Sequence, residues 1–252
     1  MQNHFNSAIC LLIKDENDYI NEWLDWHIKL GFDHFYIYDN GSKIPIKKSV
    51  SKQYLHFCSF IDFSSGYSCL QPDCYNHALQ EYGSTTKWMA FIDTDEFIRT
   101  VDGCDINSFL QDYEQFDGLY VKWIMYNASG QWYKDNRPQR ERFIHASDYD
   151  KWKPCGKSII QPLKVKAMGT HFPSGIIGQY KIVDSCKKLM RTGMAQFSPE
   201  DKIVIDHYFT RSFEEWLEKA QRGSCDPRCD RKYDEFFLYN PDMMEYNINI
   251  KP

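Results

Sequence analysis

The stretch AICLLIKDENDYINEWLDWHIKLGFDHFYIY, residues 8–38, decides the expected fold. Its first six residues form a continuous apolar run, which is typical of a strand buried on both faces. Apolar residues then recur at helical spacing from Ile20 to Ile28, and Gly31 marks the end of that helix. A second apolar run follows at 35–38. A strand, a crossover helix and another strand in this order predict a parallel sheet.

The same alternation continues along the chain. The pattern predicts strands at 55–61, 88–92, 118–126 and 158–165, and helices at 72–82, 106–113 and 213–223. Ser212 and Glu215 form a capping box in front of the last of these helices. No repeat, low-complexity tract or linker interrupts the pattern. We therefore expect an α/β fold, built as one domain over residues 1–252 around a mostly parallel central sheet flanked by helices.

Composition limits the partners of the protein. The 252 residues carry a net charge of −5 and no basic run that follows a nucleic-acid backbone, so no nucleic-acid partner is expected. No apolar stretch approaches the ~20 residues of a membrane span, although peripheral membrane contact stays open. No signal peptide is visible. The nine cysteines are odd in number and scattered, and pairs such as Cys225 and Cys229 lack zinc-knuckle spacing. These features predict a cytoplasmic protein with reduced thiols.

Three carboxylates gather directly after the expected strand at 88–92. They lie in the sequence Asp93-Thr94-Asp95-Glu96. Ligands of open α/β sheets bind beyond the carboxyl ends of strands, and bunched carboxylates are costly unless a cation balances them. Asp93 and Asp95 project to the same side if the strand geometry continues. Such hard oxygen ligands suit Mg²⁺ or Mn²⁺, whereas the alternative is an acid-rich helix start favoured by the helix dipole.

The sequence lacks the usual glycine-rich phosphate loops. No G-x-G-x-x-G follows the first strand, which argues against a dinucleotide fold. Gly156-Lys157-Ser158 is similar to the end of a P-loop, but Lys151 occupies the position of the required first glycine. Without a glycine cradle, a metal held by the acidic cluster is expected to bind a diphosphate.

Several motifs resemble glycosyltransferases related to family 2 and to family 92. The resemblance rests on residues 10–17, 23–27 and 30–42, on Asp93-x-Asp95-Glu96, on Lys157-Ser158-Ile159 and His171, and on residues 206–212, 214–215 and 222–223. It extends over about residues 8–223 and is weakest between Asn127 and Asp150. It implies the nucleotide-diphospho-sugar transferase fold, called GT-A, with a nucleotide-binding half at about 1–100 and an acceptor-binding half at 101–252.

The resemblance also implies roles for individual residues. The nucleoside, typically uridine, would be held by Lys14, Glu16, Asp39 and Asn40, with Gln71 adding a contact. A carboxylate such as Asp39 can accept from a pyrimidine N–H, although residues 39–42 also favour a plain turn. Asp95 would bind Mn²⁺ or Mg²⁺ directly, and Asp93 would bind the ribose or a metal-bound water. Lys157, and also Arg211, would neutralise phosphate.

Two further roles stay open between candidates. In many such folds a C-terminal histidine supplies another metal ligand, and His171 and His207 are the candidates here. An inverting transferase, which the resemblance favours, needs a general base for the acceptor hydroxyl. Glu141 and Asp206 are the candidates, and each is equally compatible with an ordinary salt bridge. The expected partners are a UDP-sugar donor and a glycan or glycoconjugate acceptor.

Other functions share parts of this pattern. A magnesium-dependent phosphohydrolase also places two aspartates after an apolar strand, but Phe97 stands where Thr or Val is expected. A nucleotidyltransferase would carry a glycine-rich loop before residue 20, which the sequence lacks. A non-catalytic nucleotide-sugar-binding module is the third alternative, and the intact acidic motif counts against it.

Overall fold

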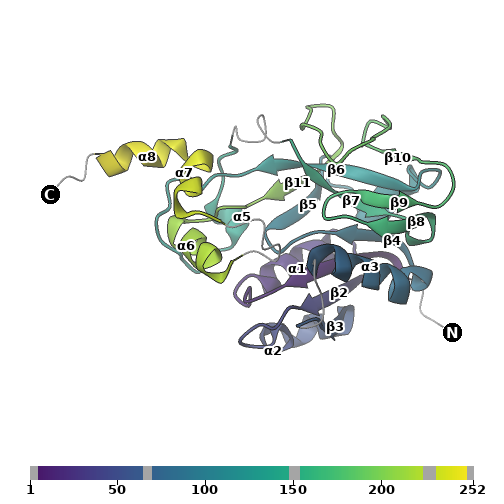
Figure 1. Ribbon diagram of the computed structural model, residues 1–252, viewed down its shortest axis with the longest axis horizontal. Coiled ribbons are helices and arrows are strands. Elements are labelled where there is room, and N and C mark those ends of the chain that lie inside the picture. Colours follow the sequence, from purple (N-terminus) through teal and green to yellow (C-terminus); the bar gives the residue numbers. More distant parts are fainter. Residues whose placement is uncertain (1–4, 65–69, 148–153, 224–230, 249–252) are drawn as a thin grey trace.

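A nine-stranded sheet organises the computed structural model, which describes residues 5–64, 70–147, 154–223 and 231–248 (Figure 1). Its described strands are β1 (Phe5–Ile13), β2 (His34–Asp39), β3 (Cys58–Asp62), β4 (Thr86–Phe91), β5 (Glu96–Thr100), β6 (Gly118–Met125), β7 (Gly156–Ile160), β10 (Ile182–Val183) and β11 (Ile203–His207). They follow the order β3-β2-β1-β4-β7-β6-β11-β5, and β10 pairs with β6. β8 (Val165–Met168) and β9 (Pro173–Ile176) form a separate two-stranded sheet.

Most pairings of the large sheet are parallel. β1 pairs in parallel with β2 and β4, β2 with β3, and β6 with β10 and β11. β7 runs antiparallel to both β4 and β6, and β5 runs antiparallel to β11. The expected α/β class with a mostly parallel central sheet is therefore confirmed. The carboxyl ends of β1, β2, β4, β6 and β11 consequently share one edge of the sheet.

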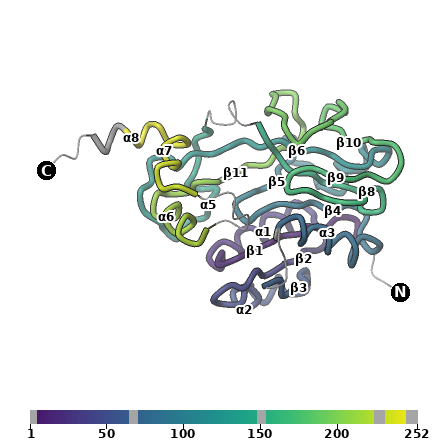
Figure 2. The backbone as a smooth tube through the Cα atoms, in the orientation of Figure 1, coloured from purple at the N-terminus to yellow at the C-terminus, as the bar shows by residue number. Residues whose placement is uncertain are grey.

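Helices cover both faces of this sheet. The α-helices are α1 (Ile20–Lys29), α2 (Ile46–Ser49), α3 (Leu70–Tyr82), α4 (Ile106–Gln111), α5 (Gln139–Arg142), α6 (Phe213–Arg222), α7 (Phe236–Tyr239) and α8 (Pro241–Ile248). The core on one face joins Leu11 of β1 to Trp23 of α1 and Leu110 of α4, whereas Cys10 packs with Tyr75 of α3 on the other face. Figure 2 shows α6, α7 and α8 gathered at one end of the molecule, at the left of the view.

Two expected strands differ from the structure. The first half of 55–61 lies in a 3₁₀ helix, Lys52–Phe57, and only the second half is strand β3. The expected strand 158–165 is divided, because β7 ends at Ile160 and a 3₁₀ turn, Pro162–Lys164, leads into β8. Pro162 has no N–H for a central sheet ladder, which explains the break. The expected strands at 88–92 and 118–126 and the expected helices at 72–82 and 213–223 are confirmed.

The ends of α1 and α6 follow their sequence signals. Gly31 follows α1 with φ +103°, and a Cβ atom there would lie 1.7 Å from a carboxylate oxygen of Asp105. Only glycine fits both the backbone angle and this close approach. At α6 the Ser212 side chain accepts from the Glu215 N–H, and the Glu215 side chain accepts from the Ser212 N–H. The predicted capping box is therefore confirmed, and it fixes the start of a helix that reaches the site described next.

Candidate active site

The acidic motif forms a tight turn at the shared carboxyl edge. β4 ends at Phe91, the Glu96 N–H donates to the Asp93 carbonyl at 3.1 Å, and β5 begins at Glu96. The indole N–H of Trp23 donates to the carbonyls of both Asp93 and Glu96, at 3.0 Å each. The strand geometry assumed for Asp93 and Asp95 therefore does not continue, and the two carboxylates meet different partners.

Asp93 lies with two other residues predicted for the site. Its Oδ1 accepts a hydrogen bond of 2.7 Å from Gln71 of α3, and its Oδ2 lies 3.0 Å from the Lys157 ammonium of β7. The Lys157 side chain is buried, whereas that of Asp93 is 33% exposed. Despite burial, the charges of Asp93 and Glu96 raise the pKa of Lys157. Gln71, Asp93 and Lys157 thus form one polar cluster with a solvent-facing carboxylate.

Asp95 is buried and faces the other way. Its Oδ2 lies 2.5 Å from the ammonium of Lys219 in α6, a residue that the sequence did not single out. The same ammonium donates to the Phe209 carbonyl at 2.6 Å. Asp95 Oδ1 faces Nε2 of His207, the last residue of β11, at 3.6 Å. Although burial opposes ionisation, Lys219 and His207 hold the pKa of Asp95 well below its usual range.

The carboxylates are balanced by protein groups. Lys157 faces Asp93, Lys219 faces Asp95, and burial raises the pKa of Glu96 well above its usual range. A cation bound at the acidic turn stays a prediction. Among the described residues, no three His, Cys, Asp or Glu side chains gather as a complete metal site.

Two atoms nevertheless fit one divalent cation. Asp95 Oδ1 and His207 Nε2 are 3.6 Å apart, a separation suited to two ligands of one ion and too long for a good hydrogen bond. On the far side of the ring, Nδ1 of His207 lies 4.0 Å from Oε1 of Glu96, and neither of these buried atoms has a hydrogen-bond partner among the described residues. Metal-binding histidines commonly present their second nitrogen to such an oxygen. Mg²⁺ and Mn²⁺ need only one or two carboxylates when substrate phosphates complete the shell.

His171 lies beside this centre without joining it. Its Nδ1 contacts the Gly156 carbonyl at 3.1 Å, and its ring meets Trp123, whose ring also contacts His207. Burial lowers the pKa of His171 to about 4, so the ring is neutral. No described contact joins His171 to Asp93 or Asp95, and His207 is the histidine placed against the acidic turn.

The surroundings of Glu16 differ from those expected for a residue that contacts the nucleoside. Its Oε2 accepts from Arg211 at 2.6 Å and its Oε1 from Arg222 at 2.5 Å, and the side chain is almost fully buried. Although burial opposes ionisation, these two arginines lower the pKa of Glu16. The neighbouring Lys14 is exposed at the end of β1. Glu16 therefore orients two cations, Lys14 is exposed, and a nucleoside contact from either residue stays a prediction.

Asp39 and Asn40 form a turn at the end of β2. The two carboxylate oxygens of Asp39 accept from the N–H groups of Ser42 and Ile46, at 2.9 Å each. The Asn40 N–H donates to the Ile13 carbonyl at 2.8 Å, which holds the turn beside β1. The turn reading is thus correct, and a nucleoside contact from these partly exposed side chains stays a prediction.

The two candidate bases lie in different parts of the structure. Asp206 precedes His207 on β11, so its side chain points to the opposite face of the sheet. Its two oxygens accept from the guanidinium of Arg99, at 2.9 and 3.0 Å. The structure therefore does not bring Asp206 to the acidic turn. Glu141 is exposed on α5, the helix whose Gln139 donates to the Thr94 carbonyl at 3.4 Å, and it stays the candidate.

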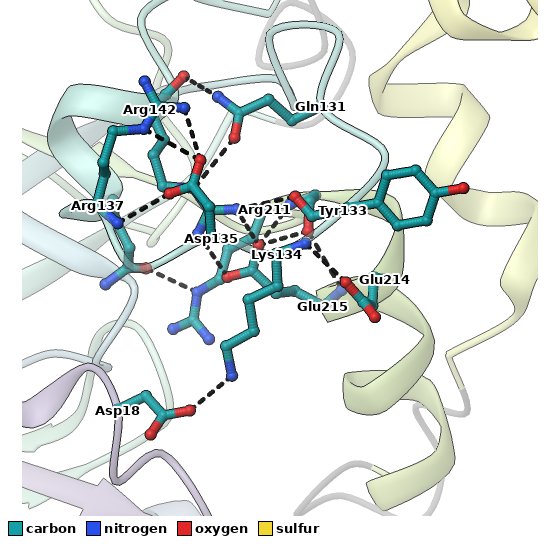
Figure 3. A network of polar contacts seen from close by, with 12 residues as sticks. Asp18, Gln131, Tyr133, Lys134, Asp135, Arg137, Arg142, Arg211, Glu214 and Glu215 are labelled. Carbon is teal, nitrogen blue, oxygen red and sulfur yellow. Dashed lines mark hydrogen bonds and ion pairs between the residues drawn. The ribbon is translucent and has the colours of Figure 1, made fainter.

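A polar network joins α6 to α5 and to the segment before α5 (Figure 3). Arg142 donates to both oxygens of Glu215, at 3.0 and 2.6 Å, and its Nε donates to Gln131 at 3.1 Å. The Tyr19 hydroxyl donates to Glu215 at 2.6 Å from the N-terminal half. Lys219 lies one turn beyond Glu215 on the same helix face, which fixes its reach toward Asp95.

Comparison with known proteins identifies the family. The glycosyltransferase family 92 profile matches residues 6–220. The chain belongs to glycosyltransferase family 92. A family 92 protein of Ricinus communis is 28% identical over 93 residues, and one of Oryza sativa subsp. japonica is 21% identical over 106 residues. These matches span 37% and 42% of this chain, but only 16% and 18% of the relatives, so the family 92 relatives are much longer than the matched region.

Solved structures with a similar arrangement are distant. S. aureus TarS 1–349 has a TM-score of 0.47 and 12% identity, with 98% of this chain and 72% of that chain covered. HddC from Yersinia pseudotuberculosis has a TM-score of 0.43 and 8% identity, with 70% and 89% covered. These values carry no functional conclusion, and the GT-A expectation rests on the family 92 match. Within the described residues, no helix is long and apolar enough to cross a membrane.

Proposed function

We propose that this family 92 chain transfers a sugar from a UDP-sugar to a hydroxyl group of a glycan or glycoconjugate, with inversion and with Mn²⁺ or Mg²⁺ bound at Asp95 and His207. The family match supports glycosyl transfer. The observation that supports a metal site is the short distance between Asp95 Oδ1, which follows β4, and His207 Nε2, at the end of β11. Neither atom makes a short hydrogen bond within the described part of the chain, and both lie where an α/β sheet binds its ligands.

The surrounding residues hold this pair in place. Lys219 occupies the second oxygen of Asp95, so the carboxylate keeps Oδ1 turned toward His207. Glu96 lies behind Nδ1 of His207 and offers an oxygen to its N–H when Nε2 binds a cation. A divalent ion bound there would neutralise charge on the departing diphosphate.

The donor and acceptor would approach from opposite sides of the acidic turn. Asp93 is the partly exposed carboxylate of the site, and it would bind the ribose while Gln71 and Lys157 hold it in place. Lys157 also supplies positive charge near the phosphates. Glu141, on the acceptor side, is the remaining candidate to take the hydroxyl proton, since Asp206 is held by Arg99 on the other face.

A screen of nucleotide-sugars tests this proposal and names the donor. The purified protein is incubated with single UDP-, GDP- and dTDP-sugars and Mn²⁺, and release of the nucleoside diphosphate is measured. Slow release from one UDP-sugar, abolished by EDTA and by Asp95→Asn, is the expected result. Absence of release and of binding for every nucleotide-sugar would contradict the transferase proposal. The anomeric configuration of a transferred sugar, read by NMR, then tests inversion.

A further inference from the structure

A cavity of about 490 Å³ lies at the end of the molecule where α7 and α8 are found (Figure 1). Its wall is formed by the segment after β6, with Asn127 and Trp132, by His145 after α5, and by Asp242 and Met243 of α8. The volume is in the range of small-ligand sites. The described residues that line the cavity include none of those proposed to bind the metal, the nucleoside or the phosphates. The cavity is therefore separate from the site at the acidic turn.

Four side chains of the wall carry polar groups that the protein leaves without a partner. In the part of the chain that the structure describes, no hydrogen bond or ion pair uses Nδ2 of Asn127, the indole N–H of Trp132, the imidazole of His145 or the carboxylate of Asp242. These donors and acceptors stand beside the flat indole ring and the apolar side chain of Met243. A sugar matches such a wall, because its hydroxyls donate and accept hydrogen bonds while its C–H groups form an apolar face.

The wall is held in shape by contacts within the protein. Asn240 joins its two halves, because its Oδ1 accepts from the Ala128 N–H and its Nδ2 donates to the Phe236 carbonyl at 2.8 Å. The ring of Trp132 packs edge-on against Phe213 of α6, with 5.3 Å between ring centres. A preformed wall loses little conformational entropy when a ligand binds. The cavity is thus built as a binding site needs to be.

Phe209 lies between this cavity and the acidic turn. Its ring contacts the ring of His207, with centres 5.5 Å apart, and the ring of Tyr239, with centres 5.0 Å apart. Tyr239 directly precedes Asn240 on the cavity wall. A ligand in the cavity is therefore near the proposed metal site but not at the atoms that react.

Asp242 indicates the charge of the ligand. Its carboxylate is exposed at the cavity, and the described lining residues include no lysine or arginine. A carboxylate accepts strong hydrogen bonds from hydroxyl groups, but it repels another anion. The cavity therefore suits an uncharged sugar better than a uronic acid or a phosphorylated sugar.

We propose that this cavity is a remote acceptor subsite, which binds an uncharged sugar unit of the acceptor glycan away from the hydroxyl that reacts. The proposal rests on the proposed function and specifies the acceptor as a glycan of more than one unit. Contacts with a remote part of a substrate supply binding energy that helps to place its reacting group. The wall is also tied to α5, the helix of Glu141, because Gln131 donates to the Arg142 carbonyl at 2.6 Å.

Glycan binding by the purified protein tests the proposal. Labelled protein is applied, without nucleotide, to an array of immobilised uncharged and acidic oligosaccharides, and the Kd of the best-bound one is measured by titration calorimetry. The variants are Asp242→Asn, which keeps the size of the side chain, and Trp132→Phe, which keeps a ring beside Phe213. Asp234→Asn is the matched control, because Asp234 is exposed on the nearby 3₁₀ helix Tyr233–Glu235 and does not line the cavity. Circular dichroism verifies that each variant is folded.

We expect uncharged oligosaccharides to bind and acidic ones to bind at least about 10-fold more weakly. The Kd of the best-bound oligosaccharide should rise about 10-fold in Asp242→Asn, as for a weakened hydrogen bond to a charged group, and about threefold or more in Trp132→Phe. Asp234→Asn should bind as the wild type does. Release of UDP from the donor without acceptor should be unchanged in Asp242→Asn, because the cavity is remote from the reacting atoms.

Three results would overturn the subsite: no glycan bound by the wild type, a preference for acidic glycans, or an unchanged Kd in Asp242→Asn. Loss of UDP release in Asp242→Asn would contradict its remote position. If glycan binding depends on Asp242 but the wild type neither binds nor cleaves any nucleotide-sugar, the cavity is a sugar site and the proposed function fails.

Discussion

The ammonium of Lys219 lies 2.5 Å from Oδ2 of Asp95, while Oδ1 of the same carboxylate faces Nε2 of His207 at 3.6 Å. One oxygen is held by the Lys219 ammonium, and the other is turned toward the His207 ring. α6 therefore contributes directly to the acidic motif, although more than a hundred residues separate them in the sequence.

The Lys219–Asp95 pair predicts a specific loss of stability. Lys219→Met leaves a buried carboxylate without its cation, and removal of one partner of a buried pair costs about 3–5 kcal/mol. Lys29→Met is the matched control, because its pair with Asp25 is exposed and should contribute little to stability. Urea unfolding at neutral pH in EDTA measures both. Addition of Mn²⁺ should recover part of the loss in Lys219→Met, and a wild-type midpoint for that variant would refute the buried pair.

The two candidate bases predict different kinetics. Glu141→Gln should lower kcat by about 10²–10⁴-fold and remove the acid limb of the pH–rate profile, as for loss of a general base. Asp206→Asn should keep that limb, because its carboxylate serves Arg99 and lies away from the acidic turn. The pH dependence of kcat for both variants, with the donor found in the screen, decides the matter. Loss of the limb in Asp206→Asn alone would reverse the assignment.

His27 predicts how stability depends on pH. Burial lowers its pKa from 6.5 to about 3, and its Nε2 accepts from the Ile98 N–H at 3.2 Å. Because the folded pKa is depressed, the stabilisation is complete above pH 6.5 and is lost as the pH falls from 6.5 toward 3. The unfolding free energy should therefore fall by about 1.4 kcal/mol per pH unit below pH 6 from this group. Urea unfolding at pH 7, 6 and 5 measures the slope, which His27→Gln should reduce; an unchanged slope would contradict a neutral His27.

Replacing Gly31 by alanine should have a steric cost that the same replacement at Gly103 lacks. Gly31→Ala combines φ +103° with a contact of 1.7 Å to Asp105 and should destabilise the fold by about 2–4 kcal/mol. Gly103 also has positive φ, +75°, but a Cβ there meets nothing within 4 Å. Gly103→Ala should therefore cost only about 1 kcal/mol. Thermal unfolding compares the two, and equal effects would show that the close approach to Asp105 is relieved at little cost.

Local sequence signals predicted most of the fold. The apolar run at 8–13, the helical spacing from Ile20 and the capping box at Ser212 correspond to β1, α1 and α6 because each depends on neighbouring residues alone. The order of strands does not follow from such signals. β7 enters between β4 and β6 from far along the chain, and only long-range pairing decides that position.

The sequence singled out site residues that belong to a motif, but it did not single out Lys219, which lies on a helix face. Asp93, Gln71 and Lys157 meet as a cluster, and Asp95 meets His207. Lys219 gave no signal, because a lysine on an amphipathic helix normally faces solvent, and only the packing of α6 buries it. Lys151, Cys225 and Cys229, which the sequence analysis considered, lie outside the described residues.

Titration of UDP into the wild-type protein and into His207→Gln, with Mn²⁺ or with EDTA, tests the central claim most directly. We predict that the wild type binds UDP with Mn²⁺, that EDTA abolishes the binding, and that His207→Gln binds UDP equally weakly under both conditions. His171→Gln serves as the control and should retain the response to Mn²⁺, because His171 lies apart from Asp95. UDP binding by the wild type that is unaffected by EDTA would contradict a metal held between Asp95 and His207.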